Sequence, residues 1–219
     1  MYILALDAST YTGTVALLSD GVLLDVRETA MRGRDEERLM PAVVNLLSAH
    51  GVSPGELGGV ACGAGPGSFT SLRIAASIAK GIASARTIPL HVAPSPCLIV
   101  AGAEPALGPG RYLALLDAMR GDVFALRVDV EPDGRLMPQG TTVLDQRSNV
   151  EARWSGEDVT LVGPDEAVNV RPHARGFATL LRQGLARAVP LATWEPDYGR
   201  KAEAQVKWER AHGRELEAR

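Results

Sequence analysis

A glycine-rich stretch, Gly63-Ala-Gly-Pro-Gly-Ser-Phe-Thr-Ser-Leu-Arg73, constrains the fold of this chain more than any other feature. It follows an apolar run, Gly59–Cys62, that reads as a buried strand, and it precedes a segment of helical periodicity, Thr70–Ala85. A glycine turn between a strand and a helix lets backbone approach a ligand or a second chain closely, and the N–H groups at the helix start attract anions. The stretch is not a Walker loop, which needs Gly-Lys-Ser/Thr, and Pro66 and Phe69 break the dinucleotide GxGxxG spacing.

Composition places the chain among ordinary globular proteins. Its 219 residues are 46% hydrophobic and 22% charged, which is enough for one large or two small domains. A net charge of −3 provides no basic surface for direct nucleic-acid binding, so we expect any RNA role to be indirect. Cys62 and Cys97 lack metal-ligand spacing and favour structural thiols in a reducing cytosol, so we expect a cytoplasmic location. The uncharged run Thr87–Ala103 is short and broken by prolines, and Met1–Asp7 has no basic head, so neither a membrane segment nor a signal peptide is expected.

The first hundred residues predict an α/β arrangement. Three β-prone runs, Ile3–Leu6, Val15–Leu18 and Val22–Val26, are separated by turn residues and predict an antiparallel meander. Apolar residues then recur at helical spacing over Asp35–His50, where Pro41 is expected to weaken the first turns.

The second predicted helix carries two stripes. Small residues recur every fourth position, and isoleucines form an apolar stripe beside them. Such a small-residue stripe lets two helix surfaces approach closely. It suits either contact with a partner or packing inside the chain's own core, and both readings stay open. The small residues are Ser71, Ala75, Ala79 and Ala83, and the isoleucines are Ile74, Ile78 and Ile82.

A second, β-rich lobe is expected after a proline-rich crossover. Strands are predicted over Arg111–Asp117, Val123–Val130 and Val159–Val162, and a helix over Ala174–Ala188. We therefore divide the chain into a first lobe, residues 1–105, and a smaller second lobe, residues 106–219, with a charged tail. At the turn between the first two of these strands, an ion-paired hairpin and a functional contact are equally open interpretations of the charges at Asp117, Arg120 and Asp122.

Five motifs in order resemble the TsaB family of bacterial tRNA threonylcarbamoyladenosine synthesis. The resemblance spans most of the chain and is strongest before Arg86. The motifs are Leu6-Asp7-Ala-Ser-Thr10, Glu37-Arg-Leu-Met-Pro41, Gly65-Pro-Gly-Ser-Phe-Thr70 with Leu72-Arg73-Ile74, Asp117-Ala-Met-Arg-Gly-Asp-Val-Phe124, and Glu195-Pro-Asp-Tyr198.

The resemblance implies an α/β fold of two ribonuclease-H-like lobes of the actin/sugar-kinase ATPase superfamily. It also implies a non-catalytic partner of TsaD, the subunit that transfers threonylcarbamoyl to the adenosine next to the tRNA anticodon. TsaE joins the larger complex, the chain alone is expected to form a homodimer, and tRNA is contacted only indirectly. No cofactor is expected.

In that family, the two first-lobe helices pack against the equivalent pair of the partner as a four-helix bundle. Here, those helices match Asp35–His50 and Thr70–Ala85. Asp35 stands where the family commonly has histidine, and Ser71 and Ala75 stand where it has glycine. The interface residues expected on this basis are Leu39, Val43, Leu46, Leu72, Arg73, Ala75, Ala76, Ile78, Ala79 and Lys80.

Two catalytic alternatives remain open, a stand-alone enzyme of the kinase superfamily and a glycoprotease-like peptidase. Nucleotide binding would draw on Asp7, Gly65, Gly67 and Ser68, yet Asp7 is followed by Ala8 rather than by a close-approach glycine. A capping role of Asp7 through Thr10 or Thr12 is the simpler interpretation.

A peptidase would need an activated nucleophile or a metal. Ser68 lacks the GxSxG elbow, and a helix cap is the simpler interpretation of this serine. The four histidines are scattered without metal-ligand spacing, so no metal site is expected.

Overall fold

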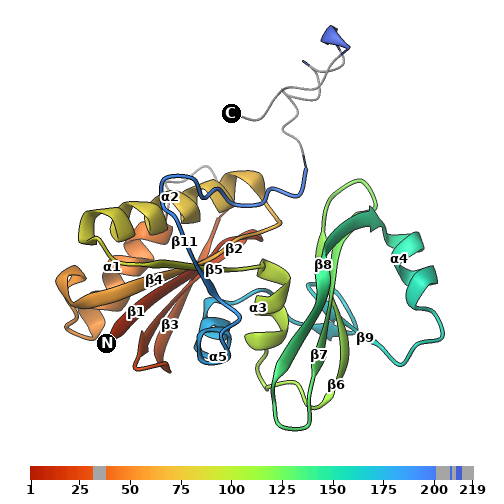
Figure 1. The fold of residues 1–219 in the computed structure, drawn as a ribbon, viewed down its shortest axis with the longest axis horizontal. Helices are drawn as coiled ribbons and strands as arrows, with labels where there is room; N and C mark the ends of the chain where they lie inside the picture. The colour runs from red at the N-terminus through yellow and green to blue at the C-terminus, as the bar shows by residue number, and fades with distance from the viewer. Residues whose placement is uncertain (32–37, 201–207, 209–210, 214–219) are drawn as a thin grey trace.

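The computed structural model describes residues 1–31, 38–200, 208 and 211–213 (Figure 1). Within that part of the chain, the strands form two mixed sheets, with the orders β11-β5-β4-β1-β2-β3 and β10-β9-β6-β7-β8. The first sheet consists of β1 (Tyr2–Asp7), β2 (Thr12–Ser19), β3 (Val22–Ala30), β4 (Leu57–Gly63), β5 (Leu90–Ala93) and β11 (Arg187–Val189). The second consists of β6 (Gly110–Asp117), β7 (Asp122–Val130), β8 (Leu136–Gln146), β9 (Thr160–Gly163) and β10 (Val168–Asn169). We call each sheet with the helices on it a lobe.

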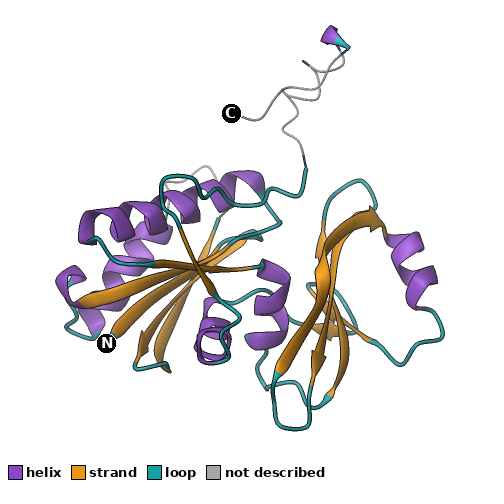
Figure 2. Ribbon diagram, in the orientation of Figure 1, coloured by secondary structure: helices purple, strands orange, loops and turns teal. Residues whose placement is uncertain are grey.

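The helices cover the faces of these sheets. None of the helices in the described part of the chain is long and apolar enough to cross a membrane. Figure 2 shows α1 and α2 together over the first sheet, and α4 on the side of the second sheet that points away from the first. The helices are α1 (Leu39–Ala49), α2 (Phe69–Arg86), α3 (Ser95–Ala101), α4 (Arg147–Trp154) and α5 (Phe177–Arg182), with 3-10 turns at Pro54–Glu56 and Ala174–Gly176.

The predicted meander is confirmed. β1 pairs antiparallel with β2, and β2 pairs antiparallel with β3. The turn between β2 and β3 places Asp20 and Gly21 at positive φ, as a tight hairpin requires. β4 and β5 then join parallel to β1, so β1 is central and is buried on both faces.

Besides a small cluster between α4 and the second sheet, two large hydrophobic cores hold the described part of the molecule together. One lies between α1, α2 and the first sheet, and includes Leu4, Leu17 and Val60. The other begins on the opposite face of that sheet, at Ile3 and Ala16, and continues through α3 and α5 into the second sheet. The two lobes therefore share one apolar core on the side where α3 and α5 lie.

Two predicted helices differ from the observed ones. α1 begins at Leu39 rather than at Asp35, and residues 32–37 lie outside the described part of the chain. Pro41 thus falls in the first turn, where a missing N–H costs the helix no hydrogen bond, so the expected weakening does not apply.

The helix expected over Ala174–Ala188 is a 3-10 turn followed by the short α5. Gly184, at φ +70°, ends the helical segment. The chain then pairs β11 with β5, so the end of the segment assigned to the second lobe adds a strand to the first sheet.

Several elements were not predicted from the sequence: β5, α3, β8, α4 and β10. The proline-rich stretch that was expected to be a crossover contains β5 and α3. Pro94 is the N-cap of α3, and Pro96 is its second residue. Proline is tolerated in a first helical turn, so it did not exclude a helix there. β8 contains Pro138 and Gly140, which an edge strand accepts.

Candidate functional site

The outward sides of α1 and α2 carry exposed apolar side chains. Both helices cover the same face of the first sheet, so these sides point away from it together. On α1, Met40 is 40% and Val44 is 49% exposed, and on α2 Phe69 is 42% exposed. We call the surface formed by Met40, Val44, Phe69, Thr70, Arg73, Ile74, Ser77 and Ile78 the outer face.

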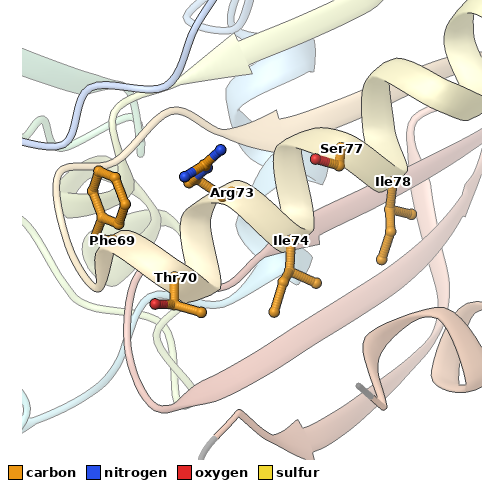
Figure 3. Close-up of a pocket in the computed structure, with 6 residues that line it drawn as sticks. All are labelled: Phe69, Thr70, Arg73, Ile74, Ser77 and Ile78. Carbon is orange, nitrogen blue, oxygen red and sulfur yellow. The ribbon is translucent and has the colours of Figure 1, made fainter. Parts of the chain in front are cut away.

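A hollow of about 400 Å³ lies on the α2 part of this face. Figure 3 shows its lining side chains on successive turns of α2, with the ring of Phe69 and the guanidinium of Arg73 at the N-terminal end and Ile78 at the other. The guanidinium carbon of Arg73 lies 5.4 Å from the centre of the Phe69 ring, a cation–π contact. The hollow is therefore lined by apolar and hydroxyl side chains, with a cation toward its N-terminal end.

Most of the predicted interface residues lie on the opposite side of these helices. Their side chains are at most 4% exposed, and all of them except that of Leu72 belong to the core between these helices and the first sheet. The small-residue stripe is likewise buried, so its reading as intrachain packing is the one the structure supports. The buried members of the predicted set are Leu39, Val43, Leu46, Leu72, Ala75, Ala76 and Ala79.

The other three predicted residues have different surroundings. Arg73 is exposed and Ile78 is half-buried on the outer face. Lys80 instead serves the chain itself, because its Nζ donates to the carbonyl oxygen of Trp194 at 2.8 Å and to Oε1 of Glu195 at 3.1 Å. The predicted set did not include Met40, Val44, Phe69 and Ile74 of the outer face, although the isoleucine stripe did indicate this side of α2.

The glycines of the loop allow close approach, but to the chain's own backbone. A Cβ at Gly65 would lie 2.1 Å from the carbonyl oxygen of Asp197, and one at Gly67 would lie 2.1 Å from that of Ser9. The amide of Ser68 donates to the same Ser9 oxygen at 2.7 Å. The loop therefore joins the start of α2 to the turn after β1 and to the C-terminal segment.

Asp7 is fully buried at the end of β1. Its Oδ1 accepts hydrogen bonds from the amide (3.0 Å) and the hydroxyl (2.8 Å) of Ser9, and its Oδ2 accepts one from the Ser95 hydroxyl (2.7 Å). Burial raises the pKa of this carboxyl group, and the three hydrogen bonds oppose that shift. Asp7 does stabilise the turn, but through Ser9 and Ser95, whereas Thr10 and Thr12 bond each other.

The other candidate catalytic groups also have partners within the chain. Ser68 is at the N-cap position of α2, but its hydroxyl lies 3.0 Å from that of Ser71 and makes no capping hydrogen bond to backbone. Burial raises the pKa of both thiols, that of Cys97 to about 12, so neither is an activated nucleophile. Among the described residues, no cluster of histidine, cysteine and acidic side chains is arranged to hold a metal ion.

The charged turn between β6 and β7 contacts a distant part of the chain. Oδ1 of Asp117 accepts a hydrogen bond from the amide of Met119 at 2.8 Å. Oδ2 of Asp122 accepts one from Nη2 of Arg200, in the C-terminal segment, at 2.5 Å. Met119 and Arg120 both have positive φ. Sequence spacing contained no signal that Arg200 would reach this turn.

A cleft of about 990 Å³ separates the lobes. Of the candidate nucleotide-binding residues, Gly67 and Ser68 line it, whereas Asp7 and Gly65 lie outside its lining. Its walls combine aromatic rings and charges from both lobes and from the C-terminal segment, among them Tyr11, Phe69, Arg73, Asp117, Met119, Phe124, Asp165, Tyr198 and Arg200.

Comparisons with known proteins agree with this architecture. The family model described as TsaD, tRNA N6-adenosine threonylcarbamoyltransferase, matches residues 30–135. The chain is 28% identical to the tRNA threonylcarbamoyladenosine biosynthesis protein TsaB of Bacillus subtilis, over 95% of this chain and 98% of that protein. It is 32% identical to the protein of the same name from Escherichia coli, over 74% of this chain and 71% of that protein.

The structure matches as well as the sequence. YeaZ from Pseudomonas aeruginosa superposes with a TM-score of 0.76 at 26% identity, over 90% of this chain and 99% of that one. The expected α/β fold of two lobes, each built on one sheet, is thereby confirmed. On this combined sequence and structural similarity, the chain belongs to the TsaB family.

Proposed function

We propose that this chain is a non-catalytic subunit in the formation of N6-threonylcarbamoyladenosine in tRNA and acts by docking on TsaD through its outer face. Its TsaB relatives are named for this biosynthesis, and the matched family model is that of the transferase TsaD. The net charge of −3 favours contact with tRNA through the partner rather than directly.

The exposed apolar outer face is the observation that carries the proposal. Side chains such as Val44 and Phe69 lie open to solvent on two long helices, where a soluble monomer usually presents polar groups. Apolar and aromatic side chains with an arginine at the edge are the composition of a protein–protein interface. A second copy of this chain would use the same face when TsaD is absent, and TsaE would join the assembled pair.

Buried hydrogen bonding supports the non-catalytic role. Asp7 and Ser68, the residues first considered for nucleotide or peptide chemistry, are engaged with neighbouring serines and backbone. Neither is paired with a general base, as nucleophilic catalysis requires. The chain thus contributes a surface, while TsaD contributes the transfer chemistry.

The test is the affinity for TsaD of the same organism, measured by isothermal titration. A glutamate at Val44 or Ile78 would bury an unpaired carboxylate in the interface, so we expect Kd to rise by about 100-fold or more. Val22→Glu is the matched control, since Val22 is 64% exposed on β3, away from the outer face. The proposal fails if Val44→Glu and Ile78→Glu bind as the wild type does while circular dichroism shows them folded, or if the wild type does not bind.

A reconstitution assay checks the role itself. We expect tRNA modification by purified TsaD, TsaE and the threonylcarbamoyl-adenylate synthase to depend on adding this chain, and Ile78→Glu to abolish that dependence. Modification that proceeds equally without the chain would contradict the proposed function.

A further inference from the structure

The segment Trp194–Arg200, which includes the motif Glu195-Pro-Asp-Tyr198, lies outside the outer face. Its first half is anchored to the first lobe. Trp194 is only 8% exposed and packs in the core under α1 and α2, and Lys80 of α2 holds its carbonyl oxygen. The amide of Asp197 then donates to the carbonyl oxygen of Ala64 at 2.7 Å, which fixes the segment to the glycine-rich loop.

Its second half reaches the second lobe. Gly199, at φ +69°, lies so close to the ring of Phe124 on β7 that a Cβ would be 2.2 Å from a ring carbon. Nη2 of Arg200 donates to Oδ2 of Asp122 at 2.5 Å and to the carbonyl oxygen of Met119 at 3.4 Å. Seven consecutive residues therefore contact both lobes.

The middle of the segment contacts the outer face. The ring of Tyr198 lies 4.5 Å, centre to centre, from the ring of Phe69, the first residue of α2. Phe69 also lines the outer-face hollow, and the guanidinium of Arg73 lies over its ring. Tyr198, Phe69 and Arg73 thus form a continuous row from the C-terminal segment to the hollow.

We propose that Trp194–Arg200 is an interlobe latch that couples the position of the second lobe to the shape of the outer face. The lobes share an apolar core on the side of α3 and α5, and Tyr198 and Arg200 line the cleft between them. The latch restrains the β6–β7 turn and orients Phe69 at the same time. The part that concerns partner affinity rests on the proposed function, whereas the link between the two lobes does not.

If Trp194–Arg200 is one latch, a substitution at either end changes hydrogen exchange at both ends. If its two contacts are unrelated, hydrogen exchange changes only at the substituted end. In the free chain, Arg200→Ala removes the hydrogen bonds to Asp122 and Met119 of the second lobe, and Tyr198→Ala removes the ring contact with Phe69 of α2. We expect each variant to accelerate hydrogen exchange at both sites, in peptides covering residues 117–123 and residues 64–72. Arg135→Ala is the matched control, since Arg135 forms an exposed ion pair with Asp133 within the second lobe.

Conservative variants guard against general unfolding. Arg200→Lys keeps a cation for Asp122, and Tyr198→Phe keeps the ring against Phe69, so we expect both to exchange as the wild type does. Exchange that rises only at the mutated end, or that is unchanged in both alanine variants, would overturn the latch.

The second readout is the affinity for TsaD. Because coupling between two sites is reciprocal, Arg200→Ala should raise Kd by about threefold, the size expected for one partly exposed ion pair. TsaD bound to the wild type should in turn slow exchange in residues 117–123. If hydrogen exchange rises at both sites but the affinity of Arg200→Ala for TsaD is unchanged, the link to docking is refuted and the proposed function stands. If the wild type does not bind TsaD, the proposed function is refuted, and the hydrogen-exchange result alone decides whether the latch exists.

Discussion

Replacing Gly67 by alanine tests whether the glycine-rich loop serves the chain's own packing. The added Cβ would lie 2.1 Å from the carbonyl oxygen of Ser9 and 2.8 Å from its carbonyl carbon. Carbon and oxygen atoms at van der Waals contact are about 3.4 Å apart. The backbone at residue 67 and the backbone at Ser9 must therefore separate by about 1 Å. Ser9 cannot move freely, since it holds Asp7 through two hydrogen bonds and accepts one from the amide of Ser68.

The cost follows from the contacts that are lost. Separation leaves the Ser68 amide without its 2.7 Å partner, at about 1–3 kcal/mol. Residual overpacking adds about 1–3 kcal/mol. We expect Gly67→Ala to lower the free energy of unfolding by about 2–6 kcal/mol, a large part of the stability of a typical domain.

Gly81 provides a matched control on the same segment of chain. It is exposed within α2, and a Cβ there would meet nothing within 4 Å. Gly81→Ala should therefore raise the free energy of unfolding by about 0.5–1 kcal/mol, because alanine loses less entropy in a helix. Urea denaturation followed by circular dichroism compares the two variants. A Gly67→Ala protein within about 0.5 kcal/mol of the wild type would refute this account of the loop.

Two further predictions concern buried side chains. Trp194→Ala should lower the free energy of unfolding, measured by urea denaturation, by about 3–5 kcal/mol, because it leaves a cavity in the first-lobe core. Trp154 is only half-buried, so Trp154→Ala should lower the free energy of unfolding by less. Equal losses in the two variants would contradict this difference in burial. Burial raises the pKa of Asp7 in the folded state above its ordinary value of 3.8, so the wild type loses stability as pH rises from the unfolded-state pKa to the folded-state pKa. Asp7→Asn lacks this titration, so its unfolding free energy relative to the wild type should increase from about pH 4 to pH 7; a difference that stays constant or decreases would show that the hydrogen bonds from Ser9 and Ser95 outweigh burial.

Local sequence determined the framework of the first lobe. Alternating and helical patterns operate over a few residues, so the meander and the helix from Thr70 were predicted close to their observed bounds. The ordered motifs also identified the family. The same patterns failed at prolines and at short elements. Pro96 interrupts an apolar run but does not prevent α3 from forming. Gly184 ends the helical segment after α5, and the chain then forms β11, which pairs with β5.

The tertiary structure decided which side of each helix faces outward. α2 has small residues on one side and isoleucines beside them, and both sides are apolar enough to pack. Only the presence of the first sheet assigns Ala75 and Ala79 to the core and leaves Ile78 at the surface. Apolar periodicity indicates that a helix has an apolar face, but it does not indicate which element packs against that face.

Contacts between distant segments were likewise decided by the tertiary structure alone. Tyr198 lies beside Phe69, and Arg200 beside Asp122, although more than seventy residues separate each pair. No local pattern encodes such contacts, because they arise when β11 returns the chain to the first sheet and directs the following segment along α2. The sequence by itself determined the elements and the family, and the packing of those elements determined the outer face and the segment that joins the two lobes.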